Sequence, residues 1–347
     1  IMFTKDSLTI QKYLEQSIKI SKNGFKELKS LYEFLKKVKY NYELTQTINN
    51  DNENNKYFNN PYVSNEILHS IKSLNNNLKL VLKINENFLT INIYYNKHNL
   101  KKFVSNIIIV ISFIFNLMNK NTGNVNINYY ITDHKKVIDK DIKDGLNYGH
   151  INNGCCSTMT NTIDIWRIEE IMKVTIHELF HLFHCDKTMN DDFNILNLYQ
   201  KRYNINSNRV NTFEAYTEIW ANILNSFILS NNEYKNFVKY INLEKEWCKI
   251  QSYKIFYLTN LGKNDVIDIN KYTNVLAYFI IRCEIFNNFK EFIKYFGNNI
   301  CNDSDNYFKF LQNVNKCQGE NDFIKKISKK NYIYRSLRMS CLEIKLF

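Results

Sequence analysis

Hydrophobic and polar positions follow different periods in successive parts of the chain. Apolar residues recur at helical spacing over 7–44, with a break at Asn23-Gly24, and an Asn-rich polar stretch over 45–62 predicts a loop. After this loop the pattern predicts a short helix over 64–75, a hairpin of strands over 78–84 and 88–95, an apolar helix over 98–119, and strands over 124–132 and 162–166. The middle of the chain therefore builds a small sheet.

Helical spacing dominates the rest of the chain. The predicted helices cover 168–185, 191–202, 209–230, 232–261, 272–287 and 304–314. This order predicts an α+β fold in which a small mixed sheet precedes a mostly helical C-terminal half. We divide the chain into a helical leader with an Asn-rich linker (1–62), a sheet and helix subdomain (63–190) and a helical subdomain (191–347).

Composition excludes some classes of protein. A chain of 347 residues with a hydrophobic fraction of 44% buries a sizeable core, which excludes a disordered protein. The net charge of +12 comes mostly from dispersed lysines in a composition typical of an AT-rich genome, and no nucleic-acid-binding motif accompanies it. We therefore expect no nucleic-acid partner. The apolar segment 103–118 is short and interrupted by Ser and Asn, so we expect a buried core helix and no membrane partner.

The cysteines and the start of the sequence bear on the compartment. Eight cysteines are scattered without a CxxC pair, which predicts reduced thiols, and residues 1–20 hold no secretory signal. We expect a cytoplasmic protein that is not secreted. The oligomeric state cannot be inferred from the pattern.

One pentapeptide points to metal chemistry. Residues 177–181 read His-Glu-Leu-Phe-His, the HExxH pattern. On a helix, His177 and His181 lie about 40° apart and can bind one metal ion. Glu178 lies about 100° from His177, beside the metal, where a general base acts on water. The alternative is a buried helix with two ordinary hydrogen-bonded histidines.

A catalytic zinc also requires a third protein ligand. No histidine follows His184, so we expect a carboxylate. Glu214 and Glu218 share one face of a predicted helix whose opposite face is apolar. We interpret Glu214 as the third ligand and Glu218 as the residue that holds the N–H of a ligating histidine. The alternative is an exposed acidic pair, and Asp186 is expected to end the first helix rather than to bind metal.

The two motifs together resemble a known family. His-Glu-Leu-Phe-His followed by Phe-Glu-Ala-Tyr-Thr-Glu is similar to the gluzincin pattern of thermolysin-like zinc peptidases, with Glu in place of Asp at 218. The segments IDIWRIEEIMKVTIHELFHLFHCD and EAYTEIWANILN and the late SLRMS also resemble predicted zinc metallopeptidases of nucleocytoplasmic large DNA viruses of the mimivirus type. The resemblance implies a zincin-like fold, one Zn²⁺ per chain and, for a viral protein, action in the host cytoplasm or the virion.

Zincin architecture implies two further placements. The strand before the active-site helix lines the cleft in that architecture, which corresponds here to 148–157 with Asn153, Gly154 and Cys155. A phenolic or cationic donor stabilises the oxyanion of the reaction, and Arg338, with Tyr334 nearby, is our candidate.

Two classes of function follow from these readings. The first is a zinc metallopeptidase, a hydrolase that cuts a polypeptide substrate with Glu178 as general base. The second is a non-catalytic structural or interaction protein, of viral or other origin, on a zincin scaffold. A third reading, a basic nucleic-acid-binding protein, rests on charge alone.

Overall fold

The computed structural model describes residues 2–18, 20, 23–51, 58–138, 145–186, 191–261, 266–301, 304–319 and 324–347. Its strands are β1 (Glu43–Asp51), β2 (Asn76–Ile84), β3 (Asn87–Tyr95), β4 (Asn124–Tyr130), β5 (Gly154–Ser157) and β6 (Thr162–Ile165). Its helices are α1 (Lys5–Ser17), α2 (Lys26–Lys36), α3 (Asn65–Lys72), α4 (Lys101–Met118), α5 (Tyr148–Ile151), α6 (Ile171–Leu182), α7 (Phe193–Tyr203), α8 (Thr212–Leu229), α9 (Tyr234–Thr259), the π-helical segment Leu276–Ile281, α10 (Arg282–Asn287), α11 (Phe289–Phe296), α12 (Ser304–Asn313) and α14 (Tyr332–Arg335). The α+β class is confirmed.

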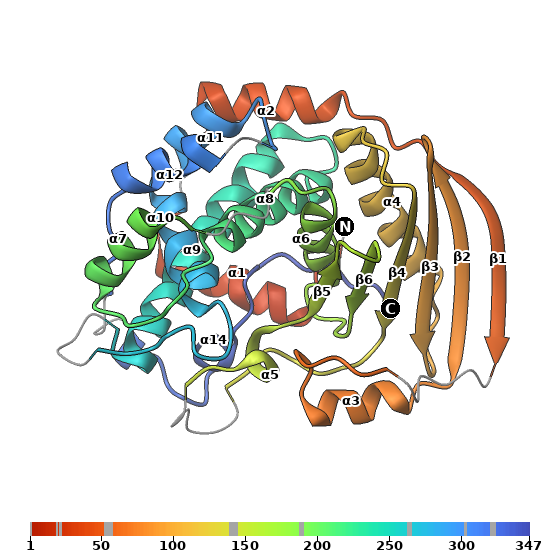
Figure 1. Cartoon of the computed structure of the whole chain (residues 1–347), viewed down its shortest axis with the longest axis horizontal. Helices are drawn as coiled ribbons and strands as arrows, with labels where there is room; N and C mark the ends of the chain where they lie inside the picture. Colours follow the sequence, from red (N-terminus) through yellow and green to blue (C-terminus); the bar gives the residue numbers. More distant parts are fainter. Residues whose placement is uncertain are drawn as a thin grey trace.

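The strands form one mixed six-stranded sheet in the order β1-β2-β3-β4-β6-β5. The β1-β2 and β2-β3 pairs are antiparallel, β3-β4 and β4-β6 are parallel, and β5 is antiparallel to β6. The predicted hairpin is confirmed, with Asn85 in the left-handed region at φ 54° as its turn requires. The short strand β5 is the edge of the sheet nearest to α6 and α8 (Figure 1).

The first strand corrects the sequence analysis. The stretch 45–62 was predicted as a loop, but its beginning belongs to β1, which pairs with β2 along its length. Asn and Thr have low hydrophobicity, so a solvent-exposed edge strand leaves no apolar alternation to read. The rest of that stretch up to residue 57 lies outside the described residues.

Alternation along the sheet separates two cores. Leu89, Ile91 and Ile93 of β3 face the main core, and Val125, Ile127 and Tyr129 of β4 do the same. The opposite face packs Tyr130 and Trp166 with α3 residues in a smaller cluster. The main core continues without a break through the leader helices, the sheet and the helical half. Residues from all three predicted segments therefore share it.

Helix α4 is the apolar segment that the sequence singled out. It is long and apolar enough to cross a membrane by length and composition. Nine of its residues are buried, and it contacts β2 and the helix α6 that carries both motif histidines. This matches the expected core helix, and α4 lies between the sheet and the helical half in Figure 1.

Candidate metal centre

Helix α6 carries both motif histidines through the middle of the molecule. Every residue of α6 except His181 is buried, and the helix contacts α4, α8, β5 and β6. It is shorter than the predicted 168–185 at both ends. Glu170 at its start adopts φ 61° and sends its carboxylate away to Lys136, so Glu169 and Glu170 do not lie in the first turn. Close packing on all sides fixes where the histidine side chains project.

Three acceptor atoms from α6 and α8 meet at one point. The Nε2 atoms of His177 and His181 are 3.0 Å apart, and the Glu214 Oε2 atom lies 3.3 Å from the first and 3.6 Å from the second. Ligand atoms about 2.0–2.1 Å from a tetrahedral zinc are about 3.3 Å apart. The Glu214 Oε2 atom is buried without a hydrogen-bond partner. These three residues, which could hold a metal ion, therefore fit a zinc ion in spacing and in donor type.

The other ring nitrogen of each histidine contacts a carboxylate. The Nδ1 atom of His177 is 3.1 Å from Glu218 Oε1, at an angle short of a good hydrogen bond, and the Nδ1 atom of His181 is 2.5 Å from Asp186 Oδ2. Each carboxylate favours a proton on Nδ1, which leaves the Nε2 lone pair for a cation. Glu218 thus contacts His177 on the side of the ring that faces away from the point where the three acceptors meet.

Asp186 is a site residue that the sequence analysis missed. A straight helix through residue 185 would place Asp186 opposite His177. The helix instead ends at Leu182, where His184 adopts φ 51° and the Cys185 amide donates to the Phe180 carbonyl at 3.0 Å. This turn folds the chain back and brings Asp186 beside His181. Only a few per cent of residues other than Gly adopt the left-handed region, so the sequence carried little signal for this turn.

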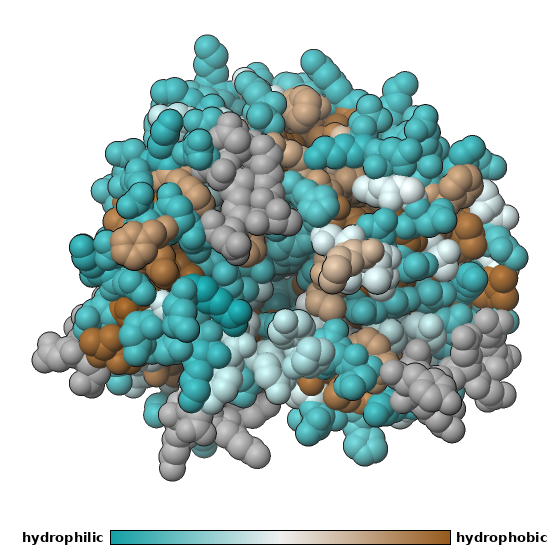
Figure 2. Space-filling model, viewed as in Figure 1, coloured by the Kyte–Doolittle hydropathy of each residue, from teal (hydrophilic) through white to brown (hydrophobic). Residues whose placement is uncertain are grey.

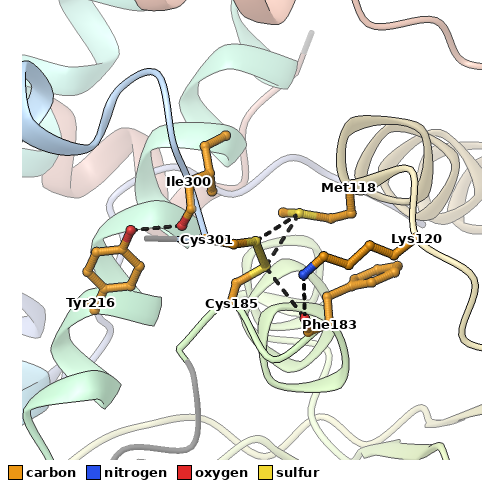
Figure 3. Close-up of a disulfide and its surroundings, with 7 residues drawn as sticks. All are labelled: Met118, Lys120, Phe183, Cys185, Tyr216, Ile300 and Cys301. Atoms are coloured by element: carbon orange, nitrogen blue, oxygen red, sulfur yellow. Dashed lines mark hydrogen bonds between the residues drawn. A yellow bond between two sulfur atoms is a disulfide. The ribbon is translucent and has the colours of Figure 1, made fainter. Parts of the chain in front are cut away.

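The end of α6 is tied to a distant segment. Cys185 forms a disulfide with Cys301, and Lys120 Nζ donates to the Phe183 carbonyl at 3.2 Å (Figure 3). In the same region the Tyr216 hydroxyl donates to the Ile300 carbonyl at 2.7 Å. The prediction that all eight cysteines are reduced is therefore wrong for this pair. The two cysteines are 116 positions apart in the chain, so their proximity depends on tertiary structure.

The candidate metal centre opens into a cleft of about 400 Å³. Its walls include the β5 residues Gly154, Cys155 and Cys156 on one side and residues of the 209–214 and 272–278 segments on the other. The space-filling view shows a hydrophilic hollow near the middle of this face (Figure 2). The predicted cleft strand 148–157 is in part wrong, because 148–151 form α5 and the strand begins only at Gly154.

Gly154 touches the candidate general base. A Cβ atom at Gly154 would lie 2.9 Å from Glu178 Oε1 and 3.1 Å from the Asp164 carbonyl oxygen, so no side chain fits there. Asn153 is buried behind this point and donates to the Glu169 carbonyl at 2.6 Å. Burial raises the pKa of Glu178, although His177 and His181 oppose that shift. A carboxylate with a raised pKa is suited to accept and return a proton.

Tyr278 lines the cleft, whereas Arg338 and Tyr334, which the sequence analysis named as candidate oxyanion donors, do not. Arg338 is fully buried and pairs with Glu343 at 3.1 Å, and neither Arg338 nor Tyr334 is among the residues of the cleft wall. Tyr278 lines the cleft from the π-helical segment, with its ring centroid 6.3 Å from that of His177. Burial and the nearby carboxylates of Glu214 and Glu218 raise its pKa, so its hydroxyl stays a donor. A π-helix breaks the 3.6-residue period, which hid this orientation from the sequence.

A buried ionic network supports the centre from behind. Lys173 Nζ, one turn before His177 on α6, donates to both oxygens of Glu218 at 2.7 and 2.6 Å. Arg282 Nη1 lies 3.6 Å from Glu218 Oε2 and donates to the Met339 carbonyl at 2.6 Å. Burial would raise the pKa of Glu218, but Lys173, His177 and Arg282 hold it well below its usual value. Glu218 is therefore an anion that can orient His177.

Glu170 extends the network toward the late part of the chain. Its carboxylate pairs with Lys136 at 2.9 Å and accepts a hydrogen bond from the Ser340 amide at 2.5 Å. Burial opposes its ionisation, but Lys136, Lys173 and Arg338 lower its pKa from 4.5 to about 2. The acid and its partner are both almost completely buried.

The electrostatics of the ligands also call for a cation. Burial would lower the pKa of His181, but the carboxylates of Glu214 and Asp186 outweigh it and raise that pKa well above the usual value. Conversely, both histidines hold the pKa of Glu214 below its usual range despite burial. The group thus attracts either a proton or a metal ion to the point where its acceptors meet.

Comparisons with known proteins give one relationship and no activity. The chain is 24% identical to an uncharacterized protein of Acanthamoeba polyphaga mimivirus over 303 aligned residues, which cover 77% of this chain and 74% of that protein. No family model matches the chain, and no solved structure matches it significantly. The likeness supports a viral relationship.

The Glu170 pair predicts an acid-sensitive stability. Because the folded-state pKa of about 2 lies below the ordinary 4.5, the stability from Glu170 is complete above about pH 5 and is lost as pH falls from 4.5 toward 2. Glu170→Gln should lower the free energy of unfolding at pH 7 by about 3 kcal/mol and flatten its slope over that pH range. Urea unfolding at several pH values measures both effects.

The matched control for this experiment is Glu15→Gln. Glu15 pairs with Lys239 on the surface, where both side chains are about half exposed, so its loss should change stability little. Equal pH slopes for Glu170→Gln and wild type would contradict the assignment.

Proposed function

We propose that this protein is a zinc-dependent metallopeptidase. The observation that carries the proposal is the convergence of His177 Nε2, His181 Nε2 and Glu214 Oε2 within 3.6 Å of one another, at the floor of a cleft that Glu178 also lines. Two nitrogens and one carboxylate with an open side toward solvent are the donor set of catalytic zinc sites. The viral relationship is compatible with this proposal but adds no activity to it.

A zinc ion held there would polarise a substrate carbonyl and lower the pKa of water. Side chains of the protein transfer the protons, stabilise the developing charge and orient the histidines. Glu178 accepts a proton from the attacking water and delivers it to the leaving amine. The Tyr278 hydroxyl donates a hydrogen bond to the carbonyl oxygen as negative charge develops on it. Glu218 and Asp186 keep the two ligand rings in the tautomer that presents Nε2.

The shape of the cleft supports a polypeptide as substrate. Among the described residues, strand β5 pairs with β6 alone and is the edge strand of the sheet beside the cleft. An extended peptide can add to such an edge by main-chain hydrogen bonds. The absence of a side chain at Gly154 lets the backbone of this strand lie directly against the Glu178 carboxylate. Peptide-bond hydrolysis is therefore the reaction that this arrangement favours.

The ligand set predicts a metal content that depends on Glu214. Mass spectrometry of the purified wild type should find about one zinc per chain, and Glu214→Ala should retain much less because a two-histidine site binds zinc weakly. Glu291→Ala, which removes an exposed glutamate that pairs with Lys294, should keep the full content. If the wild type contained no zinc after purification without chelators, the peptidase proposal would be refuted and a non-catalytic role for this protein would be favoured.

The general-base role predicts an inactive protein that still binds metal. Glu178→Gln should lower kcat for peptide cleavage by about 10²- to 10⁴-fold, because the amide cannot accept the proton. Zinc content and thermal unfolding should stay as in the wild type. If the variant turned over peptides at the wild-type rate, Glu178 would not be the base.

The position of Tyr278 predicts an effect on the chemical step. Tyr278→Phe removes one donor to the oxyanion and should lower kcat by about 10²- to 10³-fold with little change in KM. Tyr295→Phe removes a hydroxyl from an exposed tyrosine of α11 and serves as the control. A change in KM alone would assign Tyr278 to substrate binding instead.

A further inference from the structure

The arginines of this chain differ in what surrounds them. Arg202, Arg282 and Arg338 are in ion pairs with Glu284, Glu218 and Glu343, while the side chains of Arg167 and Arg335 donate to the carbonyls of Gly149 and Ile138. Arg209 is the one Lys or Arg among the described residues that line the cleft. No acidic side chain in the described ranges lies within ion-pair distance of its guanidinium. Its charge is therefore available to a molecule in the cleft.

The backbone that carries Arg209 is held in place. Asn270 Nδ2 donates to the Arg209 carbonyl at 3.0 Å, and Asn270 Oδ1 accepts from the Leu276 amide at 3.0 Å. Two residues on, Asn211 adopts φ 55° and its Nδ2 donates to Asn274 Oδ1 at 2.6 Å. These bonds join the Arg209 segment to the segment that leads into the Tyr278 helix. The backbone of Arg209, from which the guanidinium extends, is therefore held in place relative to the candidate metal centre.

The charges in the cleft are also segregated. The carboxylates of Glu178, Asp186 and Glu214 gather at the metal centre, while Arg209 is exposed on the wall. A guanidinium presents a planar pair of donors that matches a carboxylate in a bidentate manner. An acidic group on the substrate would therefore be attracted to Arg209.

We propose that Arg209 binds a carboxylate of the peptide substrate while the scissile bond lies at the metal centre. The carboxylate is either the C-terminus of the chain or an Asp or Glu side chain, since both present the same group. This inference rests on the proposed peptidase function and adds its substrate class. Arg209 is a specificity-determining residue and takes no part in the proton transfers.

The experiment compares peptides that differ in one carboxylate. Decapeptide libraries randomised at internal positions are prepared with a free C-terminal acid or an amide, and cleavage products are identified by mass spectrometry. The best substrate is then measured against its amidated form and its Asp-to-Asn or Glu-to-Gln form. Wild type, Arg209→Gln and the control Lys201→Gln, an exposed residue late in α7, are assayed for kcat and KM.

The wild type should favour the carboxylate peptide over its neutral counterpart by roughly tenfold in kcat/KM, mostly through KM. Arg209→Gln should bring this ratio close to one by lowering kcat/KM for the carboxylate peptide, and Lys201→Gln should keep the wild-type ratio. Dependence on the terminal acid would identify a carboxypeptidase, and dependence on an internal side chain an endopeptidase with an acidic subsite. A wild-type ratio near one, or a ratio that survives Arg209→Gln, would overturn the inference.

A binding assay separates this inference from the proposed function. The same peptides are titrated by fluorescence anisotropy against Glu178→Gln protein with and without Arg209→Gln. An Arg209-dependent preference for the carboxylate peptide, with no cleavage by wild type, would retain the carboxylate site and refute the peptidase. Cleavage without that preference would do the opposite. Absence of both cleavage and preferential binding would overturn both proposals.

Discussion

Three lone pairs, two from imidazole Nε2 atoms and one from a carboxylate, are directed at the same point inside this protein. Acceptors within 3.6 Å of one another repel unless a positive charge lies between them. Glu218 and Asp186 favour this arrangement because each places a proton on the far nitrogen of one ring. Helices α6 and α8, which carry these groups, pack against each other and are almost entirely buried, so the three side chains are held in place.

The cost of burying charge explains the size of the supporting network. Glu218 is nearly inaccessible to solvent, and an unpaired carboxylate there would be strongly destabilising. Lys173 and Arg282 compensate it, and each is buried in turn and needs further acceptors. The pairing of Lys136 with Glu170 continues the same pattern at the start of α6. These ion pairs lie in the core of the protein, and each buried charge is compensated by a buried charge of opposite sign.

The sequence revealed those parts of the site that depend on helical spacing. His177, Glu178 and His181 lie within five residues, and Glu214 and Glu218 are one turn apart on an amphipathic helix, so period and residue type suffice. Asp186, Tyr278 and Arg209 were not recognised as site residues, since a left-handed turn, a π-helix and a loop place them. Most strands and helices followed from apolar periodicity, whereas β1 is polar and gave no such signal. Geometry set by neighbouring residues could be predicted from the sequence, whereas geometry set by contacts between distant residues could not.

The segment from Ser336 to Glu343 has a consequence for how the protein is made. Its backbone donates to Glu170 and accepts from Arg282, and the carbonyl of Arg338 accepts from Trp247 and Gln251. It lies more than a hundred residues after α8. During synthesis, the helices that carry His177, His181 and Glu214 are therefore complete before the segment from Ser336 to Glu343 is added. A nascent chain would hold the ligands on helices whose buried charges are still unpaired. The candidate metal centre therefore depends on a segment that is translated more than a hundred residues after the helix that carries Glu214.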